Sequence, residues 1–124
     1  MPKVTSNDTY YEFHNLYPCP LYIAVGKDWH NDDFDDDCNN SLEEEEAAVT
    51  YATHTKEKEF CVLIRFSNKK SIATQSIVAH EALHAVLFIM EYIGLNVNTI
   101  TSEACCYLME WVVNCVVKVK KGEI

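Results

Sequence analysis

The sequence predicts an α+β domain in which a small, mainly antiparallel sheet of about three strands packs on a pair of helices. Two observations predict this class. Two stretches of alternating hydrophobicity, 47–55 and 60–66, come first, and two long stretches without proline or glycine, 71–93 and 101–119, follow them. A length of 124 residues suits a single domain, so we expect residues 1–124 to form one minimal domain.

The strands are expected in the first two thirds of the chain. Residues 1–46 are predicted to be an irregular N-terminal part with one strand, 21–25, and an acidic loop. Residues 47–119 are predicted to form a hairpin followed by the two helices, with the polar residues 56–58 as the turn of the hairpin. The second hairpin strand directs alternate apolar residues to one face: Phe60, Val62, Ile64 and Phe66.

Both helices carry end signals. Residues 71–93 are long enough for about six turns, and Ser71 and Gly94 suit an N-cap and a C-terminal cap. Thr101 and Ser102 suit the N-cap of the second helix. This helix has one apolar stripe, made of Cys105, Leu108, Val112, Cys115 and Val119.

The first helix carries the motif that predicts function, His80-Glu81-Ala82-Leu83-His84. Residues four apart lie on one helix face, so His80 and His84 can bind one Zn²⁺ through their ring nitrogens. Glu81 then sits beside the metal, where it can take a proton from water and pass it to a leaving amine. The pattern H-E-x-x-H is typical of zinc hydrolases, most often metallopeptidases.

A catalytic zinc usually has a third protein ligand, and the sequence leaves several candidates. The metzincin continuation is absent, because Leu87 and Met90 occupy its glycine and third histidine positions. Glu103 begins the second helix, where the helix dipole favours an anion. Glu110 would be level with His84 in a tight hairpin of helices, so it stays in reserve. The other candidates are Glu91, which is too far along its own helix, Glu123, Cys105, Cys106 and Cys115.

The motif with Glu103 downstream resembles the gluzincin class of zinc metallopeptidases, and the small size is similar to that of minigluzincins. The run 103–108 also resembles the E-A-x-A-Y-L pattern of small H-E-x-x-H proteins common in bacteriophage genomes. The resemblance covers about residues 48–117. It implies a zincin-like helix pair, zinc bound by His80, His84 and Glu103, and Glu81 as general base. The chain departs from larger gluzincins in having no second domain and no downstream Asp or His.

Charge is concentrated in one segment. The net charge is −9, and residues 28–46 hold ten acidic residues without Lys or Arg. Such a chain offers no basic face to nucleic acid, which we exclude as a partner. Several acidic positions match a calcium-binding EF-hand loop, but Cys38 occupies its glycine position and no helices flank it. A solvated, mobile acidic loop is the preferred interpretation.

Compartment is inferred from cysteine usage. The six cysteines match no disulfide framework and the first residues, 1–6, carry no apolar signal segment, so we expect free thiols in a cytoplasmic protein. The helix 71–93 carries His80, Glu81 and His84, which are too polar for a membrane span, so no membrane partner is expected.

Taken together, these features predict a small cytoplasmic zinc-dependent metallohydrolase, a metallopeptidase with a peptide or protein substrate. The strand 47–55 is a candidate sheet edge for an extended peptide, although an ordinary edge strand is the simpler interpretation. Tyr107 could stabilise an oxyanion or could be a core residue. Two alternatives remain: a non-catalytic, partner-binding or inhibitory protein that uses its acidic loop, and a structural zinc site with four protein ligands.

Overall fold

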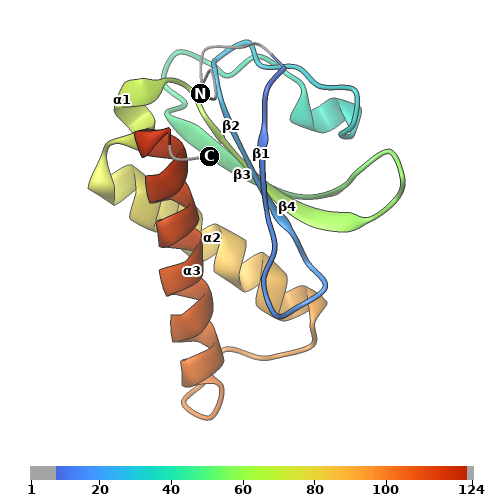
Figure 1. Ribbon diagram of the computed structural model, residues 1–124, viewed down its shortest axis with the longest axis vertical. Helices are drawn as coiled ribbons and strands as arrows, with labels where there is room; N and C mark the ends of the chain where they lie inside the picture. The colour runs from blue at the N-terminus through green and yellow to red at the C-terminus, as the bar shows by residue number, and fades with distance from the viewer. Residues whose placement is uncertain (1–7, 123–124) are drawn as a thin grey trace.

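The computed structural model describes residues 8–122 and confirms the α+β class. A four-stranded sheet carries helices on one face, and α2 and α3 cross each other there (Figure 1). Residues 1–7 and 123–124, which include the N-terminal stretch and Glu123, lie outside the described residues.

The sheet has more strands than expected and is partly parallel. Its order is β1-β2-β4-β3, formed by β1 (Tyr11–Phe13), β2 (Leu21–Val25), β4 (Phe60–Phe66) and β3 (Ala48–His54). β2 and β4 are parallel, and the other two pairs are antiparallel. β1 lies in a part predicted to be irregular. It is only three residues long, too short to show alternation, and it is held by pairing with β2.

The predicted hairpin is confirmed. β3 and β4 pair along their full lengths, and residues 55–59, which include the predicted turn 56–58, connect them. The Lys58 amide donates to the Thr55 carbonyl at 2.8 Å, and the Thr55 amide donates to the Glu59 carbonyl at 3.0 Å. Lys58 has a φ of 65°, a left-handed conformation in which glycine or asparagine is usual. The turn is therefore one that the residue types did not signal.

The first predicted helix is interrupted near its start. It is divided into α1 (Lys69–Ile72) and α2 (Gln75–Tyr92). Asn68 caps α1, and Ser71 completes a capping box with it, so Ser71 is not an N-cap. Thr74 has an extended backbone and begins α2 instead. The C-terminal prediction is confirmed: Gly94 has a φ of 81°, and the Leu95 amide donates to the Met90 carbonyl at 2.9 Å, as in a Schellman motif.

The second predicted helix is confirmed as α3 (Ser102–Lys121), and its apolar stripe is largely buried. This stripe and the buried side of α2 pack on the sheet face formed by alternate residues of β2 and β4. Fully buried members of this core include Ile23, Val62, Ile64, Phe66, Ala82, Ala85, Val86, Ile89, Leu108 and Val112.

The acidic segment covers the opposite sheet face. Most of its carboxylates are solvated, as predicted, but the segment is packed on the sheet and is not the loose loop that was expected. Trp29, Phe34 and Cys38 pack against Leu63 of β4 in a second core. These three apolar residues lie among the acidic ones without the period of a helix or a strand. Their burial could therefore not be predicted from a hydrophobic pattern.

Arg65, the chain's sole arginine, lies buried under this segment and binds its main chain. Its side chain is fully buried, and its guanidinium lies 5.3 Å from the centre of the Trp29 ring. It donates hydrogen bonds to five main-chain carbonyls, those of Gly26, Lys27, Trp29, Cys38 and Asn40. A buried cation needs hydrogen-bond partners. Main-chain carbonyls of residues 26–40 supply them to the two terminal nitrogens, whereas Nε has no partner within residues 8–122.

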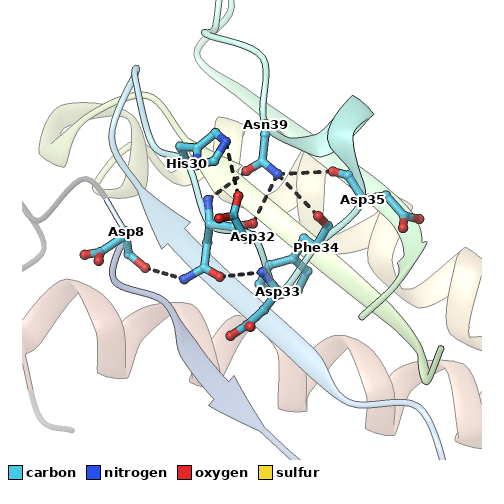
Figure 2. A network of polar contacts seen from close by, with 8 residues as sticks. Asp8, His30, Asp32, Asp33, Phe34, Asp35 and Asn39 are labelled. Carbon is cyan, nitrogen blue, oxygen red and sulfur yellow. Dashed lines mark hydrogen bonds and ion pairs between the residues drawn. The ribbon is translucent and has the colours of Figure 1, made fainter. Parts of the chain in front are cut away.

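Asparagine side chains join two parts of the segment that lie eight residues apart (Figure 2). The main-chain amide of Asn31 donates to Asn39 Oδ1 at 2.8 Å, and Asn39 Nδ2 donates back to the main-chain carbonyl of Asn31 at 3.1 Å. The carboxylates do not converge on one point: Asp33 accepts from the Tyr10 hydroxyl and Asp35 from the Thr53 hydroxyl. Burial, together with the bond to Asp33, raises the pKa of Tyr10 to about 12. The segment is a folded cover of the sheet.

All six cysteines are free, as predicted. Burial raises the pKa of the Cys19, Cys61 and Cys115 thiols to about 12, so these three stay protonated at neutral pH. Among residues 8–122, none of the helices is long and apolar enough to cross a membrane.

The role of Arg65 can be tested with Arg65→Lys. Lysine keeps the charge but cannot reach five carbonyls, so we expect a loss of about 2–4 kcal/mol of stability in urea unfolding. Amide hydrogen exchange should accelerate in residues 27–42 more than in α2. The exposed control Lys69→Ala should change stability by less than about 0.5 kcal/mol. A similarly small loss in Arg65→Lys would contradict this role.

Candidate metal centre

The histidines of the motif lie on the exposed side of α2, one turn apart. The two Nε2 atoms are 3.2 Å apart, and the ring centroids are 4.8 Å apart. The contact is a hydrogen bond in which one ring nitrogen donates and the other accepts. The helix therefore brings both ring nitrogens to one point at the surface, as the spacing predicts.

This separation suits a shared metal ion. Two Zn–N bonds of about 2.0–2.1 Å that meet at a tetrahedral angle place their nitrogens about 3.3–3.4 Å apart. The observed 3.2 Å is close to this value. The distance between the two nitrogens therefore fits two positions of a zinc site, and the hydrogen bond between them would give way to the metal.

Glu81 lies between this pair and the sheet. Its side chain is largely buried, with a residue exposure of 7%. Oε1 accepts a hydrogen bond from the Thr50 hydroxyl of β3 at 2.7 Å, and Oε2 lies 3.8 Å from His80 Nε2. One oxygen thus contacts the edge strand, and the other lies near the histidines. Sequence reasoning missed Thr50, because nothing in the chain links it to a residue 31 positions away.

The predicted third ligands are not grouped with the histidines. Within residues 8–122, no three His, Cys, Asp or Glu side chains are close enough to hold a metal ion together. Glu103 and Glu110 are exposed on α3. The helical period places both on the side of α3 opposite the buried stripe that contains Leu108 and Val112. The expectation that they face the histidines is therefore not met in this arrangement.

The remaining candidates are also separate from the pair. Glu91 is exposed on α2, one helix residue from its end, and the buried Cys115 stays protonated at neutral pH. Cys105 is half-buried and Cys106 exposed in the first turns of α3. Tyr107 is 38% exposed, so it is not a core residue.

The edge strand β3 runs beside the motif and is open along half its length. The Ser67 amide donates to the Ala47 carbonyl and the Thr55 amide to the Glu59 carbonyl. In an antiparallel pair these bonds recur at every second residue, so the odd-numbered residues of β3 bond to β4. Residues between these bonded positions, Ala48, Thr50 and Ala52, direct their amides and carbonyls outward. Beyond them the edge is closed, because the Lys56 amide donates to the Asp33 carbonyl and Phe34 bridges Thr55.

A shallow groove leads from this edge to the motif. Its floor lies where the start of β3 meets the first turns of α2, and the exposed Glu45 with the half-buried Glu46 makes one wall acidic. The groove is lined by Glu45, Glu46, Ala47, Ala48, Ser76, Ile77, His80 and Glu81. An extended chain lying in this groove would pass His80 and Glu81.

Zinc binding by the histidine pair can be measured by metal analysis after dialysis. We expect one Zn²⁺ per chain in the wild type. His80→Ala and His84→Ala should each weaken the affinity for zinc by more than about 100-fold. Removing a residue that only hydrogen-bonds to a metal ligand already costs roughly 10–100-fold in metal affinity, and removing the ligand itself should cost more. His30→Ala, which removes an exposed histidine of the acidic segment, is the control. Equal zinc in all four proteins would exclude this site.

Comparison with family models, curated proteins and solved structures finds no match to this chain. The resemblance to gluzincins therefore depends on the motif residues alone. Function has to be argued from the geometry of the histidine pair, Glu81 and the open edge of β3.

Proposed function

We propose that the protein is a small zinc-dependent metallohydrolase, specifically a metallopeptidase. His80 and His84 bind the zinc, Glu103 is its third ligand, and Glu81 is the general base. The observation that carries the proposal is the 3.2 Å separation of the two Nε2 atoms, with a Glu81 oxygen 3.8 Å from that of His80. The free thiols suit a reducing compartment, so we propose the cytoplasm.

The chemistry follows from the positions of these groups. A bound zinc ion supplies Lewis acidity, which polarises a carbonyl and brings the pKa of water to about 7. Glu81 Oε2 accepts the proton of the attacking water and then delivers it to the leaving amine. The burial of Glu81 keeps its carboxylate within a small range of positions, which suits a proton carrier between two fixed groups.

An extended peptide is the substrate that the surroundings favour. The outward amides and carbonyls of Ala48, Thr50 and Ala52 can pair with a peptide as an added strand. β3 contains no proline and no Asp, Glu, Lys or Arg, the features that usually protect an edge from pairing. Leu83 and Leu87 are 47% and 41% exposed on the same side of α2 as the histidines. They offer apolar contact to substrate side chains.

Glu103 needs a change of position to reach the metal. It follows a connector whose side chains make little contact with the rest of the protein: Ile100 is 91% exposed and Val97 is 54% exposed. To bring Glu103 to the histidines, the first turn of α3 has to rotate as well as shift, because Glu103 lies on the side opposite the buried stripe. Leu95 and the hydrogen bonds between Asn98 and Thr101 hold the connector, whereas Val97 and Ile100 oppose this movement little. The N-terminus of α3 favours an ionised Glu103, as a ligand requires.

A second candidate function is supported by the acidic segment. Arg65 and the asparagine contacts hold it in one conformation, and many of its carboxylates are exposed on the face away from the histidines. A rigid acidic surface suits a basic protein partner without catalysis. The two candidate functions differ in their need for Glu81: the peptidase requires its carboxylate, and partner binding through the acidic segment does not.

Glu81→Gln separates the two functions. As a proton carrier rather than a ligand, Glu81 should be dispensable for zinc, and its variant should bind zinc within about threefold of the wild type. Cleavage of a broad peptide library should fall by about 10²–10⁴-fold. Equal cleavage by both proteins would remove Glu81 from the mechanism. If zinc-loaded wild type cleaves nothing across the library, the partner-binding function leads.

The third ligand is tested with Glu103→Gln and Glu110→Gln, which are matched exposed residues of α3. We expect zinc affinity to fall by more than about 100-fold in Glu103→Gln and to stay unchanged in Glu110→Gln. Isothermal titration with zinc measures both. Loss of affinity in Glu110→Gln alone would assign the ligand to the second position instead.

A further inference from the structure

Thr50 contacts Glu81 in two places. Its hydroxyl lies 2.7 Å from Glu81 Oε1 and 3.3 Å from the main-chain carbonyl oxygen of the same residue. A threonine hydroxyl has a single proton to donate, and the shorter contact with the charged oxygen is the stronger bond. The bond joins the edge strand β3 to the motif helix α2.

This bond determines how the carboxylate is turned. Glu81 is buried, and a buried carboxylate oxygen is costly to leave without a donor. With Oε1 on the Thr50 hydroxyl, Oε2 is the oxygen near the histidines, 3.8 Å from His80 Nε2. Without the hydroxyl, Oε1 would need another partner, and a metal ion at the histidine pair would be the strongest one available.

We propose that Thr50 is a positioning residue for Glu81. It keeps Oε1 on the edge strand, so that Glu81 faces the histidine pair with Oε2 alone, as a base, and does not bind the metal through both oxygens. This inference rests on the proposed function for the role of Oε2, whereas the hold of Thr50 on Glu81 is independent of it. The Thr50 backbone also lies on the open part of β3, so one residue would contact a bound peptide through its main chain and the base through its side chain.

The hold of Thr50 is tested without metal by a double-mutant cycle. Thr50→Val keeps the shape and strand preference of the side chain and removes the hydroxyl. In the wild-type background it should raise the unfolding equilibrium constant about tenfold to a hundredfold, because the bond to a charged group is lost. In a Glu81→Ala background, Thr50→Val should change the unfolding equilibrium constant by less than about threefold. In the wild-type background, Thr50→Ser, which keeps the hydroxyl, should leave this constant at the wild-type value.

The effect on the metal site is tested with Co²⁺, whose visible spectrum reports the number and kind of its ligands. Wild type and Thr50→Ser should give the same spectrum. Thr50→Val should give a different one and bind Co²⁺ about tenfold more tightly, because Glu81 is free to coordinate. In the Glu81→Ala background, Thr50→Val should change neither the spectrum nor the affinity.

Two results would overturn the proposal. Equal losses of stability from Thr50→Val in both backgrounds would show that Thr50 does not act through Glu81. An unchanged Co²⁺ spectrum in Thr50→Val would show that it does not restrain Glu81 from the metal. If the wild type binds no Co²⁺, the metal function and the role of Oε2 fail together, and the unfolding cycle still decides whether Thr50 holds Glu81.

Discussion

Strand β4 lies inside the sheet and is buried on both faces, and this constraint shapes the rest of the molecule. Val62 and Ile64 face the helices, while Leu63 and Arg65 face the other side. A strand of this kind needs a cover on each face. The helices form one cover. The acidic segment forms the other because Arg65, a cation with no exposed surface, binds the main chain of that segment instead of a carboxylate.

The same arrangement leaves β3 as an edge beside α2. The helix packs its small residues, such as Ala82 and Ala85, toward the core and leaves His80 and His84 outside. Glu81, one position on from His80, points between these two sides and reaches Thr50 of the edge strand. The candidate site is therefore a junction of three parts: a helix face for the metal, a buried carboxylate, and open backbone groups for an extended chain. Each part is ordinary alone, and their combination is what favours a peptidase.

Sequence reasoning succeeded where the chemistry is local. The bounds of β4 were predicted from the alternation of Phe60, Val62, Ile64 and Phe66, although the residues between them are buried too, on the other face. Gly94 was recognised because a left-handed helix end favours glycine. It failed where distant parts meet. β1 depends on pairing with β2, and the acidic segment is held by Arg65, whose partners are main-chain atoms that no side-chain pattern reveals. The spacing of His80 and His84 followed from the helix, but the face on which Glu103 lies depends on how α3 packs.

The central claim is that His80 and His84 share one zinc ion. Anomalous diffraction at the zinc absorption edge, from crystals grown with zinc, tests it most directly because it locates the ion without assumptions about activity. We expect one strong peak within bonding distance of both Nε2 atoms, with a Glu103 oxygen as the third protein ligand. A peak only at the acidic segment, or none at the histidine pair, would contradict it.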